Sequence, residues 1–264
     1  MSTKRIIVVG GSAAGPKAAS KARRLDENAE ITIFQKASDL SMASCGYPYY
    51  IGGFFDDRSQ LLCSPAGVVR DSKFFWNAKK ITTKVLTEVT KIDRKNKCIE
   101  FTDLTTSETG TAEYDKLVIA TGATPRKPPV PGIELEGITT LQSLSDADFL
   151  RRIRDEGKIK KAVVIGGGLI GIETCEALRL AGIEITLIEL LPQLLTFLDK
   201  HMARLVEKYV KTKANVILQN GVASFLGENG KLTAVKLQDG TEIPCDLAVV
   251  AIGVIPNTKL ANEA

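Results

Sequence analysis

The stretch KAVVIGGGLIG at residues 161–171 decides the fold. Its first five residues form a largely apolar run, which is typical of a strand buried on both faces of a parallel sheet. The glycines that follow permit a tight turn, close approach of a ligand's pyrophosphate and close packing of the next helix. That helix is predicted to run to about Ala181, and residues 184–188 are predicted to form the next strand. The order strand, glycines, helix, strand therefore predicts a βαβ unit that binds a dinucleotide.

An acidic residue stands where the second strand of this unit ends. Glu189 follows the glycines by roughly 20 residues, the spacing at which a carboxylate accepts hydrogen bonds from a cofactor's adenine ribose. No Arg or Lys occurs in residues 190–199 to neutralise a 2′-phosphate, so the sequence favours NADH over NADPH. The predicted dinucleotide contacts in this half are Gly166, Gly168, Leu169, Ile170, Gly171 and Glu189.

The N-terminal end carries the same pattern in a less regular form. Residues 5–9 and 30–34 are predicted strands, residues 17–28 a helix, and GGSAAG at residues 10–15 the first turn, with Ser12 at the middle glycine position. Two such units predict an α/β fold with two Rossmann-like, three-layer ββα nucleotide-binding domains in tandem. Between them we expect one or two short helices in residues 65–80 and strands at residues 81–85, 87–93, 97–102, 111–114 and 116–120.

The residues after the second N-terminal strand depart from the pattern. Gln35 stands where the acid is expected, and its side-chain carbonyl can still accept a hydrogen bond from a ribose hydroxyl. Lys36 either attracts a phosphate or is simply an exposed lysine. The predicted cofactor contacts in this half are Gly10, Gly11, Ser12, Ala13, Ala14, Gly15, Gln35 and Lys36.

Composition narrows the class of protein. The 264 residues are 44% apolar and 25% charged with a net charge of +4, so neither a nucleic-acid stripe nor a membrane-binding patch is expected. The N-terminus leads directly into a strand, and no targeting segment or transmembrane run is expected. Five cysteines at irregular spacings favour a reducing cytoplasm over a disulfide framework. With one histidine in the sequence, no metal site is predicted.

The segment SMASCGYPYYIGG at residues 41–53 contains the candidate reactive group, Cys45. Pro48 is tolerated in a first helical turn, so we place Cys45 at or just before a helix N-terminus, where the amides favour a thiolate. The alternative is that Cys45 is a small buried hydrophobe, as many free cysteines are. The two nucleotide-binding patterns favour the redox interpretation.

The chain resembles the pyridine nucleotide-disulfide oxidoreductase family from end to end. The resemblance is carried by both glycine patterns, by S-x-x-x-C-G-x-P-Y-Y from Ser41, by A-T-G at residues 120–122 and by G-x-x-P-N from Gly253. The cysteine segment and residues 75–89 are most similar to the single-cysteine coenzyme A-disulfide reductase and NADH oxidase-like branch. The resemblance implies an FAD-binding domain at 1–124, a linker at 125–144, an NAD(P)H-binding domain at 145–252 and the start of a return to the FAD domain at 253–264.

The resemblance also implies a route for the electrons. NADH would reduce the flavin, and the flavin would reduce a mixed disulfide on the catalytic Cys45, with Ser41 and Ser44 near the sulfur. Lys79 aligns with a basic residue that the family uses for coenzyme A, or is an exposed lysine. The implied cofactor contacts beyond the glycine patterns are Ser44, Val89, Ala120, Thr121, Gly122, Glu173 and Gly253.

Three departures from the family bear on the mechanism. No C-x-x-x-x-C pair occurs, which excludes an internal redox disulfide. No lysine follows Cys45 to pair with Glu173, so Glu173 is either beside the flavin or a solvated glutamate. The chain stops soon after Asn257, whereas the family continues with a flavin segment and a dimerisation domain. We therefore expect a truncated chain, and a homodimer for the full-length protein.

The sequence leaves the substrate open. The interpretation we favour is that the protein reduces a small-molecule disulfide or persulfide that is similar to coenzyme A disulfide. One alternative is an NADH oxidase or peroxidase in which Cys45 cycles through a sulfenic acid. Another is a nucleotide-binding fragment without catalytic activity.

Overall fold

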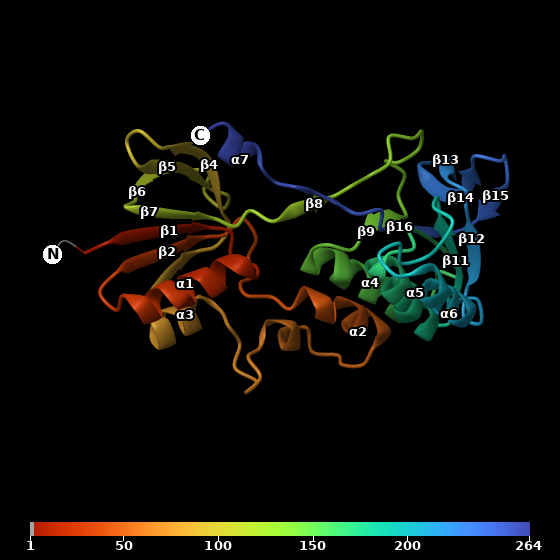
Figure 1. Cartoon of the computed structure of the whole chain (residues 1–264), viewed down its shortest axis with the longest axis horizontal. Coiled ribbons are helices and arrows are strands. Elements are labelled where there is room, and N and C mark those ends of the chain that lie inside the picture. Colours follow the sequence, from red (N-terminus) through yellow and green to blue (C-terminus); the bar gives the residue numbers. More distant parts are fainter. Residues whose placement is uncertain (1–2) are drawn as a thin grey trace. The chain divides into compact units, whose positions relative to one another are not determined.

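The computed structural model describes residues 3–264, which form two compact units (Figure 1). Unit 1 comprises the described residues up to Ala43, Asp57–Ala123 and Pro256–Ala264, and unit 2 comprises Ser44–Asp56 and Thr124–Ile255. Each unit has a parallel sheet with helices, as the sequence predicts. The four domain ranges given above stay predictions.

The central sheet of unit 1 is parallel, in the order β3-β2-β1-β7. Val8 packs on one face with residues of the helices, whereas Ile7 and Val9 pack on the other face against an antiparallel sheet. Figure 1 shows these three layers, with α1 and α3 on one side and β4, β5 and β6 on the other. The elements are β1 Arg5–Val9, α1 Ala14–Leu25, β2 Glu30–Phe34, η2 Arg58–Leu62, α3 Ser72–Lys79, β3 Ile81–Lys84, β4 Thr87–Asp93, β5 Cys98–Asp103, β6 Thr109–Glu113, β7 Lys116–Ile119 and α7 Lys259–Asn262.

The central sheet of unit 2 is also parallel, in the order β12-β11-β10-β16-β9. One face bears helices, and the other packs Val163 and Ile165 against the antiparallel strands β13, β14 and β15. The three-layer ββα arrangement is thus present twice. The elements are β9 Ile138–Thr140, α4 Leu144–Glu156, β10 Lys161–Ile165, α5 Leu169–Leu180, β11 Glu184–Glu189, α6 Lys200–Val210, β12 Asn215–Leu218, β13 Val222–Glu228, β14 Lys231–Leu237, β15 Glu242–Pro244 and β16 Leu247–Val250. Short strands β8 Ala123–Pro125 and β17 Val254–Pro256 lie where the chain passes between units.

The cysteine segment folds as two short elements of unit 2, η1 Ser44–Gly46 and α2 Tyr47–Gly52. Cys45 is in η1, directly before α2, and Pro48 lies in the first turn of α2, as predicted. Helix α2 packs against α4 and α5 of the same unit.

Two helices begin at positions other than predicted. Helix α1 begins at Ala14 instead of Lys17, because Pro16 fits the first turn of a helix. Helix α3 begins at Ser72, where the Asp71 side chain caps it by accepting the N–H of Phe74. No helix covers residues 65–71.

Candidate functional site

In the glycine loop of unit 2, two glycines are required by close packing, and a third has open space beside it. Gly166 has φ +110°, and a Cβ there would lie 2.4 Å from the Ala251 carbonyl oxygen. A Cβ at Gly171 would lie 1.9 Å from the Gly166 oxygen, so helix and loop approach each other closely. At Gly168, the N-cap of α5, an added Cβ has no neighbour within 4 Å. The middle glycine thus leaves space for a ligand's phosphates at a helix N-terminus.

Glu189 holds this loop at the end of β11. One carboxylate oxygen accepts the Gly167 N–H at 2.6 Å, and the other accepts the Leu191 N–H at 2.8 Å. Each oxygen retains a further lone pair, which can accept a ribose hydroxyl. We call Glu189 a strand-end acceptor.

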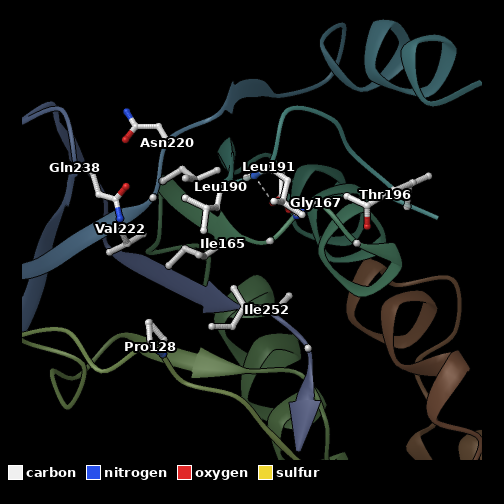
Figure 2. Close-up of a pocket in the computed structure, with 18 of the residues that line it drawn as sticks. Pro128, Ile165, Gly167, Leu190, Leu191, Thr196, Asn220, Val222, Gln238 and Ile252 are labelled. Atoms are coloured by element: carbon white, nitrogen blue, oxygen red, sulfur yellow. Dashed lines mark hydrogen bonds between the residues drawn. The ribbon is translucent and has the colours of Figure 1, made fainter. Parts of the chain in front are cut away.

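A cavity of about 600 Å³ opens beside the loop and Glu189 (Figure 2). Its walls are mostly apolar, and Figure 2 shows the amide side chains of Asn220 and Gln238 toward one end and Thr196 toward the other. None of the described residues that line it is a lysine or arginine. The lining residues are Pro128, Val130, Ile165, Gly166, Gly167, Gly168, Ile188, Glu189, Leu190, Leu191, Leu195, Thr196, Phe197, Asn220, Gly221, Val222, Gln238, Ala251, Ile252 and Gly253.

The cavity brings together part of the predicted set. Gly166, Gly168, Glu189 and Gly253 line it, whereas Leu169 and Ile170 are exposed residues at the start of α5 and Glu173 is exposed further along that helix. Sequence reasoning missed Leu190, Thr196, Asn220, Val222 and Gln238. They come from segments after β11 and β12, from the start of β13 and from the residue after β14, which only the sheet topology brings together. For Leu190, Thr196 and Asn220 the available signal is that binding residues in such folds follow the carboxyl ends of parallel strands, whereas Gln238 follows the antiparallel strand β14.

Unit 1 repeats the loop geometry with different chemistry. Gly10 has φ +108°, and a Cβ there would lie 2.1 Å from the Ala120 oxygen; a Cβ at Gly15 would lie 1.8 Å from the Gly10 oxygen. Gln35 is the strand-end acceptor, because its Oε1 accepts the Gly11 N–H at 2.8 Å. The remaining loop residues Ser12, Ala13 and Ala14 are exposed around the start of α1.

The second half of the Gln35 amide explains why an amide occupies this position. Its Nε2 donates to the backbone carbonyl of Asp39 at 3.1 Å, in a site only 6% exposed. Neighbouring Lys36 points its ammonium at Glu88, 2.8 Å away, on the surface. Val89 is partly buried on β4, packed against the core of unit 1.

The A-T-G motif meets the last residue of the G-x-x-P-N motif, Asn257, within unit 1. The Thr121 hydroxyl donates to the Asn257 carbonyl at 2.7 Å, and the Asn257 side chain donates to the Thr121 carbonyl at 2.9 Å. The Asn257 N–H also donates to the Gly122 carbonyl at 2.9 Å. Ala120 donates its N–H to Val9, so this junction lies where β1 and β7 end.

The five cysteines differ in access. Cys45 is exposed, Cys63 and Cys98 are half-buried, and Cys175 and Cys245 are buried. Burial raises the pKa of the Cys175 and Cys245 thiols to about 12, the latter with help from the Asp246 charge. These two thiols therefore stay neutral near pH 7. The exposure of Cys45 contradicts its interpretation as a small buried hydrophobe.

The three predicted substrate residues do not share one unit. Ser41 belongs to unit 1, where its N–H donates to the Gly11 carbonyl at 2.8 Å, whereas Ser44 belongs to η1 of unit 2. Lys79 ends α3 in unit 1, with its ammonium 5.9 Å from the centre of the Phe74 ring. Over residues 3–264, no helix is long and apolar enough to cross a membrane, and no group of three or more His, Cys, Asp or Glu could hold a metal ion.

Comparison with known proteins places this geometry in a family. The family described as pyridine nucleotide-disulphide oxidoreductase matches residues 4–264. An NADH oxidase of Methanocaldococcus jannaschii is 33% identical over 98% of this chain and 56% of its own length. A coenzyme A disulfide reductase of Staphylococcus haemolyticus is 30% identical over 99% of this chain and 56% of its own length. The structure of an NAD-dependent persulfide reductase from A. fulgidus is 39% identical, with a TM-score of 0.94 over 98% of this chain and 48% of that one. The chain spans about half the length of the curated relatives it matches.

Proposed function

The chain belongs to the pyridine nucleotide-disulphide oxidoreductase family, and from that premise we propose that it is the FAD- and NADH-binding part of a flavoprotein that reduces a small disulfide or persulfide through Cys45. The observation that carries this proposal is the repeated loop. Gly11 with Gln35 and Gly167 with Glu189 use the same hydrogen bond in two units. Two dinucleotide sites in one chain suit a hydride donor and a flavin.

The residues of unit 2 fit NADH. The open space at Gly168 accepts the pyrophosphate, and the Glu189 carboxylate accepts the adenosine ribose hydroxyls. The apolar wall beside Leu190 suits the adenine. A 2′-phosphate would meet the Glu189 charge with no lysine or arginine among the cavity's described lining residues, so NADH is preferred.

The residues of unit 1 fit FAD at the pyrophosphate. The loop from Gly10 to Gly15 presents the start of α1, and neutral Gln35 in place of an acid holds the loop. Ser12 is admissible at the middle position, since the corresponding Gly168 of unit 2 has open space around it.

Cys45 carries the chemistry of the chain itself. Its thiolate attacks one sulfur of the substrate disulfide, forms a Cys45 mixed disulfide and releases the other sulfur as a thiolate. Bound FAD would supply the two electrons, taken from NADH as a hydride, that cleave the mixed disulfide, return Cys45 to the thiolate and release the rest of the substrate as a second thiolate. The similar S. haemolyticus and A. fulgidus proteins, a coenzyme A disulfide reductase and a persulfide reductase, support this substrate class.

The similar M. jannaschii protein supports a second candidate, an NADH oxidase. In that reaction O₂ would take two electrons from NADH through bound FAD to give hydrogen peroxide, and the peroxide would oxidise the Cys45 thiolate to a sulfenic acid with release of hydroxide, instead of Cys45 forming a mixed disulfide. Oxygen consumption with NADH, measured without any disulfide present, separates the two.

Cys45→Ser in the full-length protein tests the proposal. We expect loss of NADH-dependent reduction of coenzyme A disulfide and of persulfide, with the flavin absorbance of the purified protein unchanged. Cys63→Ser is the matched control, because Cys63 is half-buried in unit 1, and it is expected to retain turnover. Retained turnover in the Cys45 variant would contradict the single-cysteine mechanism.

A further inference from the structure

Helix α2, which follows Cys45, is too short to be stable by itself. It has six residues and ends in a Schellman motif, in which Phe54 N–H donates to Tyr49 at 3.0 Å and Gly53 N–H donates to Tyr50 at 3.2 Å. The rings of Tyr49 and Phe54 lie 5.5 Å apart, the apolar contact that accompanies this motif. The Tyr50 carbonyl oxygen keeps a second lone pair, which can accept a donor from outside the helix.

One side chain of α4, Arg151, supplies such a donor and also bonds the residues just after α2. Its Nη1 donates to the carbonyls of Tyr50 at 2.8 Å and Phe55 at 2.9 Å, and its Nη2 donates to the Asp56 carboxylate. Its Nε donates to Asp155, one turn along α4, at 2.9 Å, which orients the guanidinium. The side chain is only 12% exposed, so a single arginine links the end of α2 to α4 at a shielded position.

The same end of α2 is closely packed on both sides. A Cβ at Gly53 would lie 2.2 Å from the guanidinium of Arg154, which stands one turn after Arg151. A Cβ at Gly52 would lie 3.3 Å from Leu180 and 3.5 Å from Ala177 on α5. All of these residues belong to unit 2, whose glycine loop begins α5.

We propose that Arg151 is a positioning residue for the redox cysteine: its guanidinium holds α2 on α4 and thereby fixes Cys45 relative to α5 and the dinucleotide loop. The inference rests on the proposed function of Cys45. Arg151 touches neither Cys45 nor the cavity lining, so it acts through α2. Cys45 is exposed in a three-residue turn, and the placement of its sulfur follows the placement of α2.

The test compares two arginines of one helix in the full-length protein. Arg151→Met removes the links to α2, and Arg151→Lys restores a charge that reaches only one or two of the acceptors. Arg152→Met is the control, because Arg152 is 66% exposed and its ion pair with Glu156 is 3.9 Å long. The readouts are hydrogen exchange of the amides at residues 47–53, kcat, KM for NADH and the unfolding midpoint.

We expect Arg151→Met to accelerate amide exchange in α2 and to lower kcat by about 10- to 100-fold, since a misplacement of about 1 Å costs as much as 100-fold in rate. KM for NADH is expected to stay within about twofold, Arg151→Lys to recover part of kcat, and the control to match the wild type. A lowered unfolding midpoint with unchanged kcat per folded molecule would overturn the proposal, as would unchanged exchange in α2. Should Arg151→Met not fold, Arg151→Lys and Asp56→Asn serve in the same comparison. If Cys45→Ser retains turnover, the proposed function fails, and the exchange of α2 still decides whether Arg151 holds the helix.

Discussion

Replacing Glu189 by glutamine changes the charge of the strand-end acceptor with almost no change in shape. Each carboxylate oxygen now accepts one backbone N–H, from Gly167 at 2.6 Å and from Leu191 at 2.8 Å. A glutamine has one oxygen and one NH₂ group, so one of these two N–H groups would face another donor. A hydrogen bond to a charged group contributes about 1.5–3 kcal/mol, and its loss loosens either the glycine loop or the turn after β11.

The two dinucleotides are expected to respond differently. NADH loses a charged acceptor for its ribose, and a loss of about 1.4 kcal/mol corresponds to a tenfold weaker Kd. NADPH loses the same acceptor, but its 2′-phosphate is no longer repelled by the Glu189 carboxylate. At about 5 Å in a water-like medium each pair of unit charges contributes about 0.8 kcal/mol, hence about 1.6 kcal/mol for a 2′-phosphate dianion. The two effects on NADPH nearly cancel, so the preference for NADH narrows by about tenfold.

Isothermal titration of both dinucleotides against Glu189→Gln and wild type measures this change. Glu176→Gln is the control, since Glu176 is an exposed glutamate of α5 outside the cavity lining. Raising the salt concentration weakens the repulsion and brings the wild-type affinities closer together. An equal fall in affinity for NADH and NADPH would refute the reasoning, because it would place the 2′-position away from the carboxylate.

Three further predictions follow from packing and burial. Gln35→Glu puts a carboxylate oxygen against a backbone carbonyl in a site 6% exposed, so urea unfolding is expected to show a loss of about 3 kcal/mol; an unchanged midpoint contradicts this. Gly171→Ala forces a Cβ to within 1.9 Å of a backbone oxygen and lowers the melting temperature, whereas Gly168→Ala keeps it and weakens NADH binding; equal melting shifts would be evidence against an open middle position. Because burial raises the pKa of Cys175 and Cys245 from 9.0 to about 12, the unfolded thiols ionise first and the free energy of unfolding falls as the pH rises from 9 toward about 12. With alanine at both positions, the free energy of unfolding is expected to fall less steeply with pH, by up to about 1.4 kcal/mol per pH unit for each thiol removed. Urea titrations at several pH values measure this slope, and equal slopes in the variant and the wild type would contradict the prediction.

The sequence predicted the fold because its strongest signals are local. The apolar run at residues 161–165, the glycines after it and Glu189 each act within one βαβ unit, so their spacing alone indicates the arrangement. The first unit was predicted in spite of Ser12 and Gln35, since neither changes the order of the elements.

The features that the sequence did not predict depend on contacts between residues that are distant in sequence. Asn220 and Gln238 reach the cavity because β12 and β14 are placed by the sheet topology, which no local pattern specifies. Ser44–Asp56 groups with unit 2 because α2 packs against α4 and α5, and the bonds of Arg151 to this segment span about 100 residues of sequence, which no local pattern indicates. The roles of Gln35 and Glu189 in holding the loops were likewise missed, because the sequence shows that these side chains can accept hydrogen bonds but not which N–H groups donate to them.

Each central strand packs against a hydrophobic core on both of its faces, and this limits which substitutions the strand tolerates. In β1, Ile7 and Val9 pack into one layer and Val8 into the other, so neither face is free to take polar residues. In β6, Thr109–Glu113, exposed and partly buried positions alternate. In a saturation scan, substitutions along β6 are therefore expected to be accepted at every second position, whereas β1 shows no such period across Ile7, Val8 and Val9. Tolerance to mutation in this chain follows the number of layers that a strand separates.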